Sequence, residues 1–417
     1  MAARNEIATY IPKGALEALD DQSAAPRGAD ARQPTTEELA DLVRALQILE
    51  SVQGRAGVMA TAPDELVANL QTFMTTVMAP AENRLMESNN ATLEAKFDSH
   101  DLLGWSGSFF TWWRKVKPFE WKTPGAPEAF PSKGRLALFG DWGTGLYGAP
   151  ACAQSIQNAG KYDLVLHLGD VYYSGTKNEI KDRFVDLWPK VAGAKNRGLN
   201  GNHEMYTGGV AYFDTVQKAF GQTSSYFALQ NEHWILGCLD TAYKDHDLHG
   251  DQAAWLEGLA AASPGKRLVL FSHHQPFSLL DNQGPNLVKK LASLFERKRI
   301  YAWYWGHEHH CILYRPHTLY GLRGRCVGHG GFPYFRDKKL FGDAAPRTPE
   351  WKTLESRNLV PSARILDGEN QYIDDQPSDY GPNGYMTLEF DGADLFEIVH
   401  MPDGTEVWNQ PITRLDT

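Results

Sequence analysis

From about residue 135 onward, short apolar runs alternate with longer stretches in which polar residues predominate. The runs at 135–139 (RLALF), 163–168 (DLVLHL) and 267–271 (RLVLF) are mostly apolar, which is typical of strands buried on both faces. About 20 residues separate the first two runs, enough for a helix that crosses over between parallel strands. Further strands are predicted at 225–229, 233–240, 300–305 and 325–330. This alternation predicts an α/β domain.

The C-terminal part of the chain carries three more strand patterns, which cover residues 384–390, 395–401 and 405–409. Short turns separate them, because Asp391-Gly392 and Asp403-Gly404 are turn sequences of the hairpin type. We expect an antiparallel meander that closes the domain.

The first third of the chain has a helical pattern instead. Residues 1–33 are polar and rich in Ala, Asp and Pro, which predicts a flexible arm. A capping box at 35–38 precedes apolar residues at helical spacing, and further helices are predicted at 63–80 and about 81–97. Prolines between 118 and 131 mark a linker. We therefore predict a helical N-terminal region with an aromatic-rich linker at 34–131 and a catalytic α/β domain at 132–417.

The segment Trp105–Trp121 is unusually rich in aromatic side chains, with basic residues between them. Tryptophan beside Lys and Arg suits a lipid surface, which is one interpretation of this segment. The other is that the rings pack the helical region onto the next domain, since aromatic side chains bury large areas. We favour packing over peripheral lipid contact.

Composition narrows the classes of function further. The formal net charge of -10 disfavours an electrostatic nucleic-acid binder, so no nucleic-acid partner is expected. No apolar run approaches the ~18 residues of a transmembrane helix, and the N-terminus lacks the apolar core of a signal peptide, so we expect a cytoplasmic protein. The four cysteines are widely spaced, which predicts buried thiols rather than a disulfide framework.

Polar residues with metal-binding side chains follow the predicted strands. Asp141, Asp170, His274 and His307 each come directly after an apolar run, and the segment Asn202-His203-Glu204 follows the same pattern. Because the carboxyl ends of parallel strands share one edge of a sheet, these side chains are expected to converge there. Glycine precedes several of them, which permits a sharp turn and a close approach of the backbone.

The chemistry of this set favours metal ions. Hard oxygen donors with imidazole, and no thiolate, suit iron, zinc or manganese. The candidate ligands are too many for one four-coordinate ion but fit two ions that share a carboxylate. Two ions ~3.5–4 Å apart are suited to an in-line displacement at phosphorus.

Five ordered motifs in the chain resemble those of the calcineurin-like metallophosphoesterases. They are Asp141-Trp142-Gly143, Gly169-Asp170-Val171-Tyr172-Tyr173, Gly201-Asn202-His203-Glu204, His274-Gln275-Pro276 and Gly306-His307-Glu308-His309. The resemblance covers roughly residues 135–335 and implies a fold of two central sheets flanked by helices. Gly143 stands where many relatives have a ligand histidine. Instead, residues 169–173 resemble the G-D-x-x-Y motif of the purple acid phosphatase branch, in which Tyr173 would be the ligand.

The resemblance also implies roles for individual residues. Metal one would be bound by Asp141, Asp170, Tyr173 and His309, and metal two by Asp170, Asn202, His274 and His307. His203 would contact the phosphate or protonate the leaving oxygen as the catalytic residue. Since a tyrosinate is a hard donor, we expect Fe(III) paired with Zn(II), Fe(II) or Mn(II). The implied reaction is hydrolysis of a phosphomonoester, on a small molecule or a phosphoprotein, by a metal-bound hydroxide.

Several alternatives remain open at this point. His273 could replace His274 as a ligand, and Glu204, His273, His310 and His329 are candidates for supporting the ligands. Tyr172 is expected to be a packing residue and His167 to lie in the core. His246 and His249 either line the mouth of the site or belong to a solvated loop. The same metals would also serve a phosphodiesterase acting on cyclic nucleotides or phospholipid head groups. A further alternative is a binding module in the helical region, carried by a metallophosphoesterase scaffold.

Overall fold

The computed structural model describes residues 119, 122–172, 174–244, 246–281, 284–373 and 377–412, together with 40, 41, 44, 65, 66, 68 and 69. The chain divides into two compact units. One contains Met1–Pro118 with Tyr206–Gly208, and the other contains Phe119–Met205 with Gly209–Thr417. Of the N-terminal region, residues 40, 41, 44, 65, 66, 68 and 69 are described, and they are helical, as predicted. The predicted arm, the third helix and the segment 105–121 apart from Phe119 lie outside the described residues.

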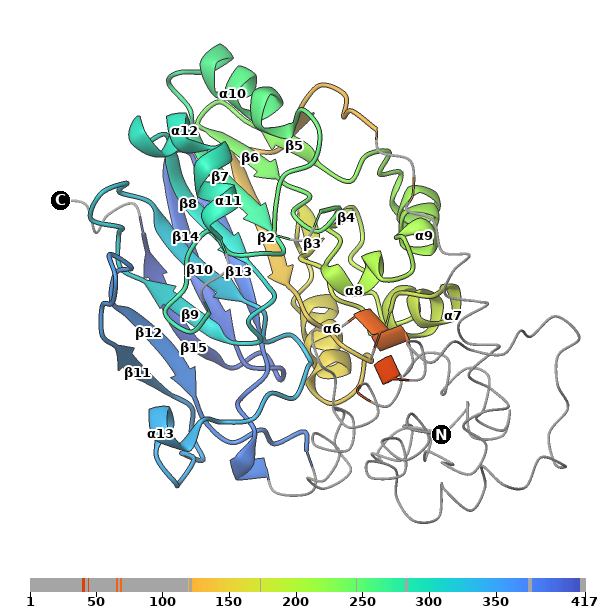
Figure 1. The fold of residues 1–417 in the computed structure, drawn as a ribbon, viewed down its shortest axis with the longest axis vertical. Helices are drawn as coiled ribbons and strands as arrows, with labels where there is room; N and C mark the ends of the chain where they lie inside the picture. The colour runs from red at the N-terminus through yellow and green to blue at the C-terminus, as the bar shows by residue number, and fades with distance from the viewer. Residues whose placement is uncertain are drawn as a thin grey trace, which may run out of the picture. The chain divides into compact units, whose positions relative to one another are not determined.

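The second unit contains two β-sheets (Figure 1). The six-stranded sheet has the order β15-β14-β13-β2-β3-β4. Its strands are β2 (Lys133–Phe139), β3 (Leu164–His167), β4 (Lys195–Gly198), β13 (Tyr385–Asp391), β14 (Asp394–His400) and β15 (Glu406–Pro411). β2, β3 and β4 are parallel, whereas β13, β14 and β15 form an antiparallel meander that joins β2. The predicted C-terminal meander is therefore confirmed.

The nine-stranded sheet has the order β1-β5-β6-β7-β8-β10-β9-β12-β11. Its strands are β1 (Glu128–Ala129), β5 (Phe227–Gln230), β6 (Trp234–Cys238), β7 (Arg267–Ser272), β8 (Ile300–Trp305), β9 (Cys311–Tyr314), β10 (Arg323–Val327), β11 (Glu350–Leu354) and β12 (Ala363–Asp367). β6, β7, β8 and β10 are parallel neighbours. Antiparallel strands β9, β12 and β11 extend the sheet on one side.

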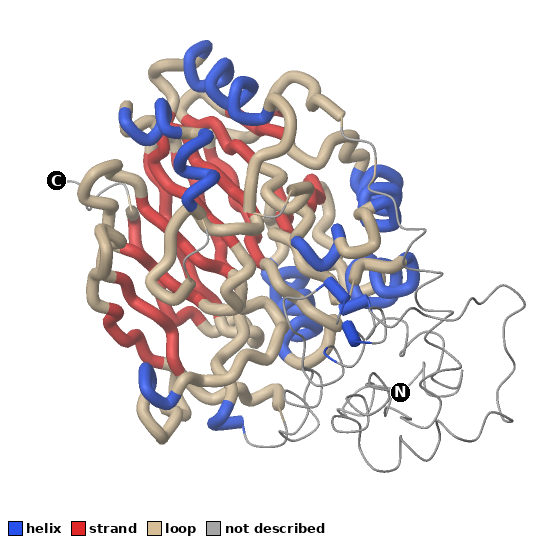
Figure 2. The backbone as a smooth tube through the Cα atoms, in the orientation of Figure 1, coloured by secondary structure: helices blue, strands red, loops and turns tan. Residues whose placement is uncertain are grey.

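The two sheets pack face to face, and helices cover their outer faces (Figure 2). Along β2, Leu136 and Leu138 enter the core between the sheets, whereas Ala137 and Phe139 face the outer helical layer. This alternation explains why the strand needs apolar residues on both faces. The described residues thus confirm the architecture of two central sheets flanked by helices.

The helices occupy the connections between strands. The helical segments are α6 (Gly148–Ala159), α7 (Lys177–Ile180), η5 (Lys181–Val185), α8 (Asn202–Met205), α9 (Val210–Phe220), α10 (Gln252–Ala262), α11 (Pro285–Lys290), α12 (Ala292–Glu296), α13 (Lys338–Phe341) and η6 (Pro377–Asp379). α6 is the predicted crossover helix between β2 and β3. No helix among the described residues is long and apolar enough to cross a membrane. All four cysteines are buried free thiols, as predicted.

A buried ion pair joins the two sheets inside the core. Arg325 of β10 and Glu397 of β14 lie 2.8 Å apart, and both side chains are almost fully buried. The Tyr304 hydroxyl donates a further hydrogen bond of 2.6 Å to Glu397. The carboxylate is therefore satisfied from two strands of the opposite sheet.

Candidate metal centre

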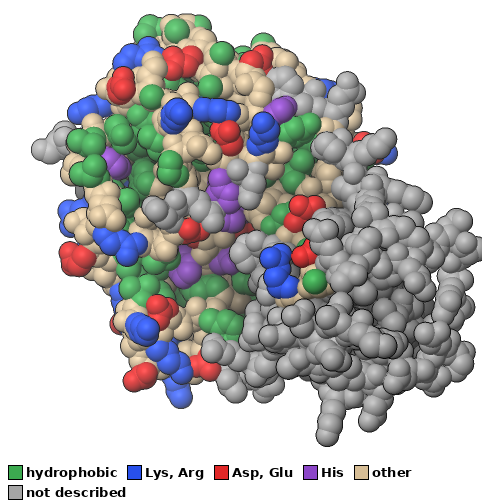
Figure 3. Space-filling model, viewed as in Figure 1, with side chains coloured by type: hydrophobic (Ala, Val, Ile, Leu, Met, Phe, Trp, Pro, Cys, Tyr) green, Lys and Arg blue, Asp and Glu red, His purple; other side chains and the backbone are tan. Residues whose placement is uncertain are grey.

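The candidate ligands lie at the carboxyl ends of parallel strands in both sheets. Asp141 follows β2, Asp170 follows β3 and Asn202 begins α8 after β4. From the other sheet, His273 and His274 follow β7, and His307 and His309 follow β8. Figure 3 shows histidine side chains gathered near the middle of the visible face. The convergence that the strand pattern predicts is observed for these residues.

Unusual backbone angles turn several of these residues toward the centre. Among the described residues, ten other than glycine have a positive φ, and five of them belong to this centre. They are Asp141 (58°), Asp170 (71°), His246 (57°), His307 (66°) and His309 (54°). This conformation is unfavourable for side chains with a Cβ and persists only where surrounding structure imposes it. Such a concentration is typical of a functional site.

Two glycines make room for the aspartates. A Cβ at Gly201 would lie 2.1 Å from Oδ1 of Asp170, and one at Gly306 would lie 2.5 Å from Oδ2 of Asp141. Both distances are far shorter than a van der Waals contact. The close approach of the backbone that the glycine pattern suggested is therefore present at these two positions.

One group of donors contains Asp141, Asp170 and His309, whose ligand atoms all lie within 4.8 Å of one another. Nε2 of His309 lies 3.5 Å from Oδ1 of Asp141. The Tyr172 hydroxyl lies 2.8 Å from Nε2 of His309 and 3.3 Å from Oδ2 of Asp170. Tyr172, which the sequence indicated only as a packing residue, thus brings its phenol among the donors. Tyr173 lies outside the described residues.

A second group contains Asp170, His273 and His307. Nε2 of His273 lies 3.1 Å from Oδ1 of Asn202, 3.3 Å from Oδ2 of Asp170 and 3.2 Å from Nδ1 of His307. His274 has different neighbours, since its Nδ1 lies 3.0 Å from the Thr241 hydroxyl. Of the two adjacent histidines, His273 is therefore the one beside Asp170 and Asn202.

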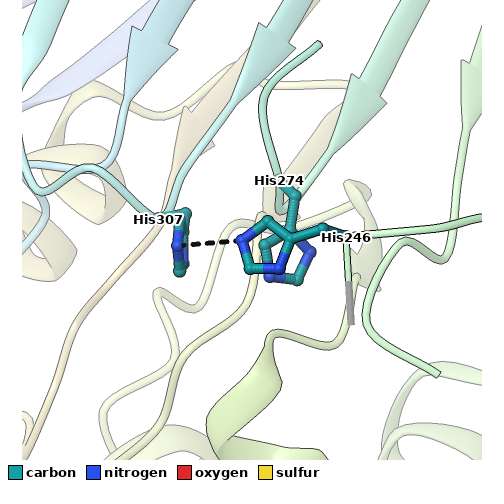
Figure 4. A group of neighbouring side chains, drawn as sticks. All are labelled: His246, His274 and His307. Atoms are coloured by element: carbon teal, nitrogen blue, oxygen red, sulfur yellow. Dashed lines mark hydrogen bonds between the residues drawn. The ribbon is translucent and has the colours of Figure 1, made fainter. Parts of the chain in front are cut away.

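A third group contains His246, His274 and His307 (Figure 4). Nε2 of His246 lies 3.3 Å from Nε2 of His307, and its ring centroid lies 3.9 Å from that of His274. His246 comes from the loop after β6. The sequence suggested no more than a place at the mouth of the site, and no motif marks it as a ligand.

The residues after Asn202 hold the aspartate loops in place. The Glu204 carboxylate accepts backbone hydrogen bonds from Asp170 (3.1 Å), from Val171 and from Gly201. The backbone nitrogen of His203 donates to Oδ1 of Asp170 at 3.2 Å, and the His203 ring packs on Tyr172 with centroids 3.9 Å apart. Both residues are buried. Glu204 therefore acts through the backbone, whereas His203 presents its ring beside the first donor group.

The remaining histidines that the sequence singled out lie outside the three donor groups. Nδ1 of His310 bonds with the Glu308 carbonyl and its ring packs on Tyr334. The His329 backbone carbonyl accepts a hydrogen bond of 2.8 Å from Gly384. His167 is a core residue, as predicted, because it packs among the aromatic rings of Phe139, Trp142 and Phe184.

The electrostatics of the centre favour bound cations. Burial raises the pKa of Asp141 well above its usual range, and the Asp170 carboxylate adds to the rise. Burial also opposes ionisation of Asp170, but the positive potential of His273 holds the pKa of Asp170 well below its usual range. Burial lowers the pKa of His309 to about 3 and that of His307 well below its usual range. Two buried carboxyl groups beside several imidazoles form a donor set that fits divalent or trivalent metal ions.

Part of the chain matches a known protein family. Residues 134–311 match the family model described as calcineurin-like phosphoesterase. No curated protein sequence matches the chain.

Three solved structures are similar at low identity. GAP50, described as the anchor in the inner membrane complex of Plasmodium, is 11% identical with a TM-score of 0.49, over 67% of this chain and 88% of that one. PhoD is 11% identical with a TM-score of 0.43, over 70% and 73% of the two chains. Vacuolar Protein Sorting 29 from Cryptosporidium parvum is 14% identical with a TM-score of 0.33, over 67% and 98%. The relation of this chain to a known family therefore rests on the match of residues 134–311 to the family model, and not on these structures.

Proposed function

We propose that this protein is a phosphoric ester hydrolase that acts on phosphomonoesters with a pair of metal ions, because residues 134–311 match the model of the calcineurin-like phosphoesterase family. The observation that carries the proposal is the arrangement of two donor groups around one carboxylate. Asp170 belongs both to the group with Asp141 and His309 and to the group with His273 and His307. A shared carboxylate is the arrangement that two neighbouring ions require.

The proposed ligands follow the geometry of these groups. Asp141, Asp170, His309 and the predicted Tyr173 would hold metal one, and Asp170, Asn202, His273 and His307 would hold metal two. Contacts of His273 with Asp170 and Asn202 favour it over His274. When bound, the two ions would supply positive charge and Lewis acidity for transfer of a phosphoryl group to water.

The chain's own side chains would complete the chemistry. The His203 ring lies beside Tyr172 and the first donor group, where it can hydrogen-bond the phosphate or give a proton to the leaving oxygen. Glu204 would keep Asp170 in place through the backbone of residues 170, 171 and 201. Hydrolysis in this arrangement requires no phosphoenzyme.

A comparison of two model substrates tests the proposal. Turnover of p-nitrophenyl phosphate and of bis-p-nitrophenyl phosphate is measured on metal-replete protein, with Asp170→Asn as the inactive variant. Asp186→Asn is the matched control, because Asp186 is an exposed carboxylate that pairs with Lys181 on the surface. We expect the wild type to prefer the monoester and Asp170→Asn to lose most of its activity. The control variant should lose no activity.

Two results would contradict this proposal in different ways. A preference for the diester would make the protein a phosphodiesterase with the same centre. Near-normal turnover by Asp170→Asn with metal bound would show that Asp170 is not the shared ligand.

A further inference from the structure

We propose that His246, His274 and His307 form a third metal-binding position, beside the proposed pair, for a borderline divalent cation such as Zn²⁺. The proposal shares His307 with the proposed function but does not depend on hydrolysis. The three side chains come from three loops, which follow β6, β7 and β8. With His273 in the second donor group, His246 and His274 have no role in the proposed pair.

The spacing of the nitrogens suits tetrahedral zinc. Zn–N distances of ~2.0–2.1 Å in a tetrahedral site place the ligand nitrogens ~3.3–3.4 Å apart. Nε2 of His246 and Nε2 of His307 lie 3.3 Å apart, and one nitrogen from each of the three rings lies within 4.8 Å of the others. Small side-chain rotations would therefore bring the third nitrogen, from His274, into place. Three histidines leave a fourth position for water or a substrate oxygen.

His307 can serve both positions because its two nitrogens face different neighbours. Nδ1 lies 3.2 Å from Nε2 of His273, in the second donor group, and Nε2 lies toward His246 (Figure 4). A metal at the third position would bind Nε2 and leave Nδ1 for the proposed pair. Filling both positions would require the His307 ring to release its one N–H proton to water, because each of its two nitrogens would then be a ligand.

Hydrogen bonds fix the conformation of the loop that carries His246. The Asp240 carboxylate fixes its start by accepting backbone hydrogen bonds from Ala242 and Tyr243 at 3.1 and 2.9 Å. The turn closes through a hydrogen bond of 2.9 Å from the Asp247 nitrogen to the Lys244 carbonyl. The left-handed backbone at His246, with φ of 57°, directs the ring from the tip of this turn. The His246 ring is therefore held beside the other two.

His274 has the hydrogen-bonded support that metal-binding histidines usually have. Its Nδ1 lies 3.0 Å from the Thr241 hydroxyl, which leaves Nε2 as the nitrogen that can bind an ion. The backbone nitrogen of His274 also donates to this hydroxyl, at 3.0 Å. The ring orientation is thus fixed from the same loop that carries His246.

Metal stoichiometry tests the inference independently of activity. The full-length protein is stripped with a chelator, reloaded by equilibrium dialysis against rising free Zn²⁺, and its metal content is measured by mass spectrometry. We expect three equivalents for the wild type and two for His246→Asn, because asparagine tolerates the left-handed backbone but removes the imidazole. His249→Asn is the matched control, since His249 lies in the same loop and stacks on Tyr243 instead, and it should keep three.

Two further measurements sharpen the test. Thr241→Val should weaken the third equivalent by about 10- to 100-fold without removing it, as loss of a supporting hydrogen bond typically does. Reconstitution with Co²⁺ should add a visible ligand-field band with the third equivalent, and His246→Asn should lack that increment. Circular dichroism and the melting temperature show whether each variant is folded.

The inference is wrong if the wild type binds no more than two ions, or if His246→Asn still binds three. Either result would leave the hydrolysis proposal intact when two ions support turnover. Conversely, if the wild type binds three ions but hydrolyses neither model ester, the proposed function is refuted and the third metal-binding position is still supported.

Discussion

Replacing Gly201 by alanine should inactivate the proposed hydrolase by displacing one carboxylate. The added Cβ would lie 2.1 Å from Oδ1 of Asp170 and 2.8 Å from the Asp170 backbone nitrogen. Since real Cβ contacts require about 3.2 Å, the carboxylate oxygen must move by about 1.1 Å and the backbone by about 0.4 Å. Gly201 does not have a positive φ, so alanine introduces no backbone strain of its own.

A displacement of about 1 Å at a shared ligand has a large kinetic effect. Misplacement of this size can cost about 100-fold in rate, equivalent to about 2.7 kcal/mol of transition-state stabilisation. The assay is kcat/KM for p-nitrophenyl phosphate at saturating metal, together with the melting temperature. We expect a loss of about 100-fold or more in a protein that remains folded.

The control is another glycine-to-alanine change where nothing stands in the way. Gly258 lies in α10, and a Cβ there meets no atom within 4 Å. Gly258→Ala should leave activity unchanged and raise stability by about 0.5–1 kcal/mol, because alanine favours a helix. Activity of Gly201→Ala within threefold of the wild type would refute the reasoning, because Asp170 would then be free to move without consequence.

Three other predictions concern colour, pH and core stability. If Fe(III) occupies the metal-one position, the protein purified in air should be coloured by charge transfer from tyrosinate to iron. Tyr173→Phe should then remove the colour, whereas Tyr172→Phe should only shift the absorption band. Loss of colour in Tyr172→Phe alone would mean that the ligand is the Tyr172 hydroxyl, which lies beside His309. Burial raises the pKa of Glu308 to about 7, so the folded state holds a proton that the unfolded state releases near pH 4.5, and this contribution to stability is lost as the pH rises through 7. Glu308→Gln should therefore flatten part of the fall in melting temperature between pH 5 and 8, and an unchanged profile would contradict the assignment. Glu397→Ala leaves Arg325 buried without its carboxylate and should lower the free energy of unfolding in urea by about 3–5 kcal/mol. Glu389→Ala, which removes the partly exposed partner of Arg135, should lower it by less than about 1 kcal/mol, and equal losses would refute the role of burial.

The strands that form the centre of each sheet could be predicted because they are buried on both faces. The predicted runs at 135–139, 267–271 and 300–305 match β2, β7 and β8 closely. The strands β1, β4, β9, β11 and β12 were not predicted. β4 (KNRG) and β11 (EWKTL) are polar strands at sheet edges, and their pairing depends on a neighbour rather than on a hydrophobic pattern.

The candidate ligands could be predicted because each follows a recognisable strand, but their individual directions could not. Tyr172 and His246 show why: the motif that contains Tyr172 indicates Tyr173 as the ligand, and no motif contains His246. The Tyr172 hydroxyl reaches Asp170 and His309 from a turn in which Asp170, two residues earlier, has a left-handed backbone. The position of His246 depends on the turn between Lys244 and Asp247, and the choice between His273 and His274 depends on how the chain leaves β7. These features arise from tertiary structure, which hydrophobic periodicity does not describe.

The strained backbone and the buried carboxylates have a common physical explanation. Each left-handed residue of the centre costs free energy, and the Asp141 and Asp170 side chains repel each other in a buried environment. Strands β2, β3, β7 and β8 can impose this arrangement because they belong to two extensively packed sheets, and the Glu204 carboxylate holds two of the loops together. Cations would relieve the repulsion but not the backbone strain. The two sheets therefore position the donors of the centre, which directs them at one point instead of leaving them spread over a flexible loop.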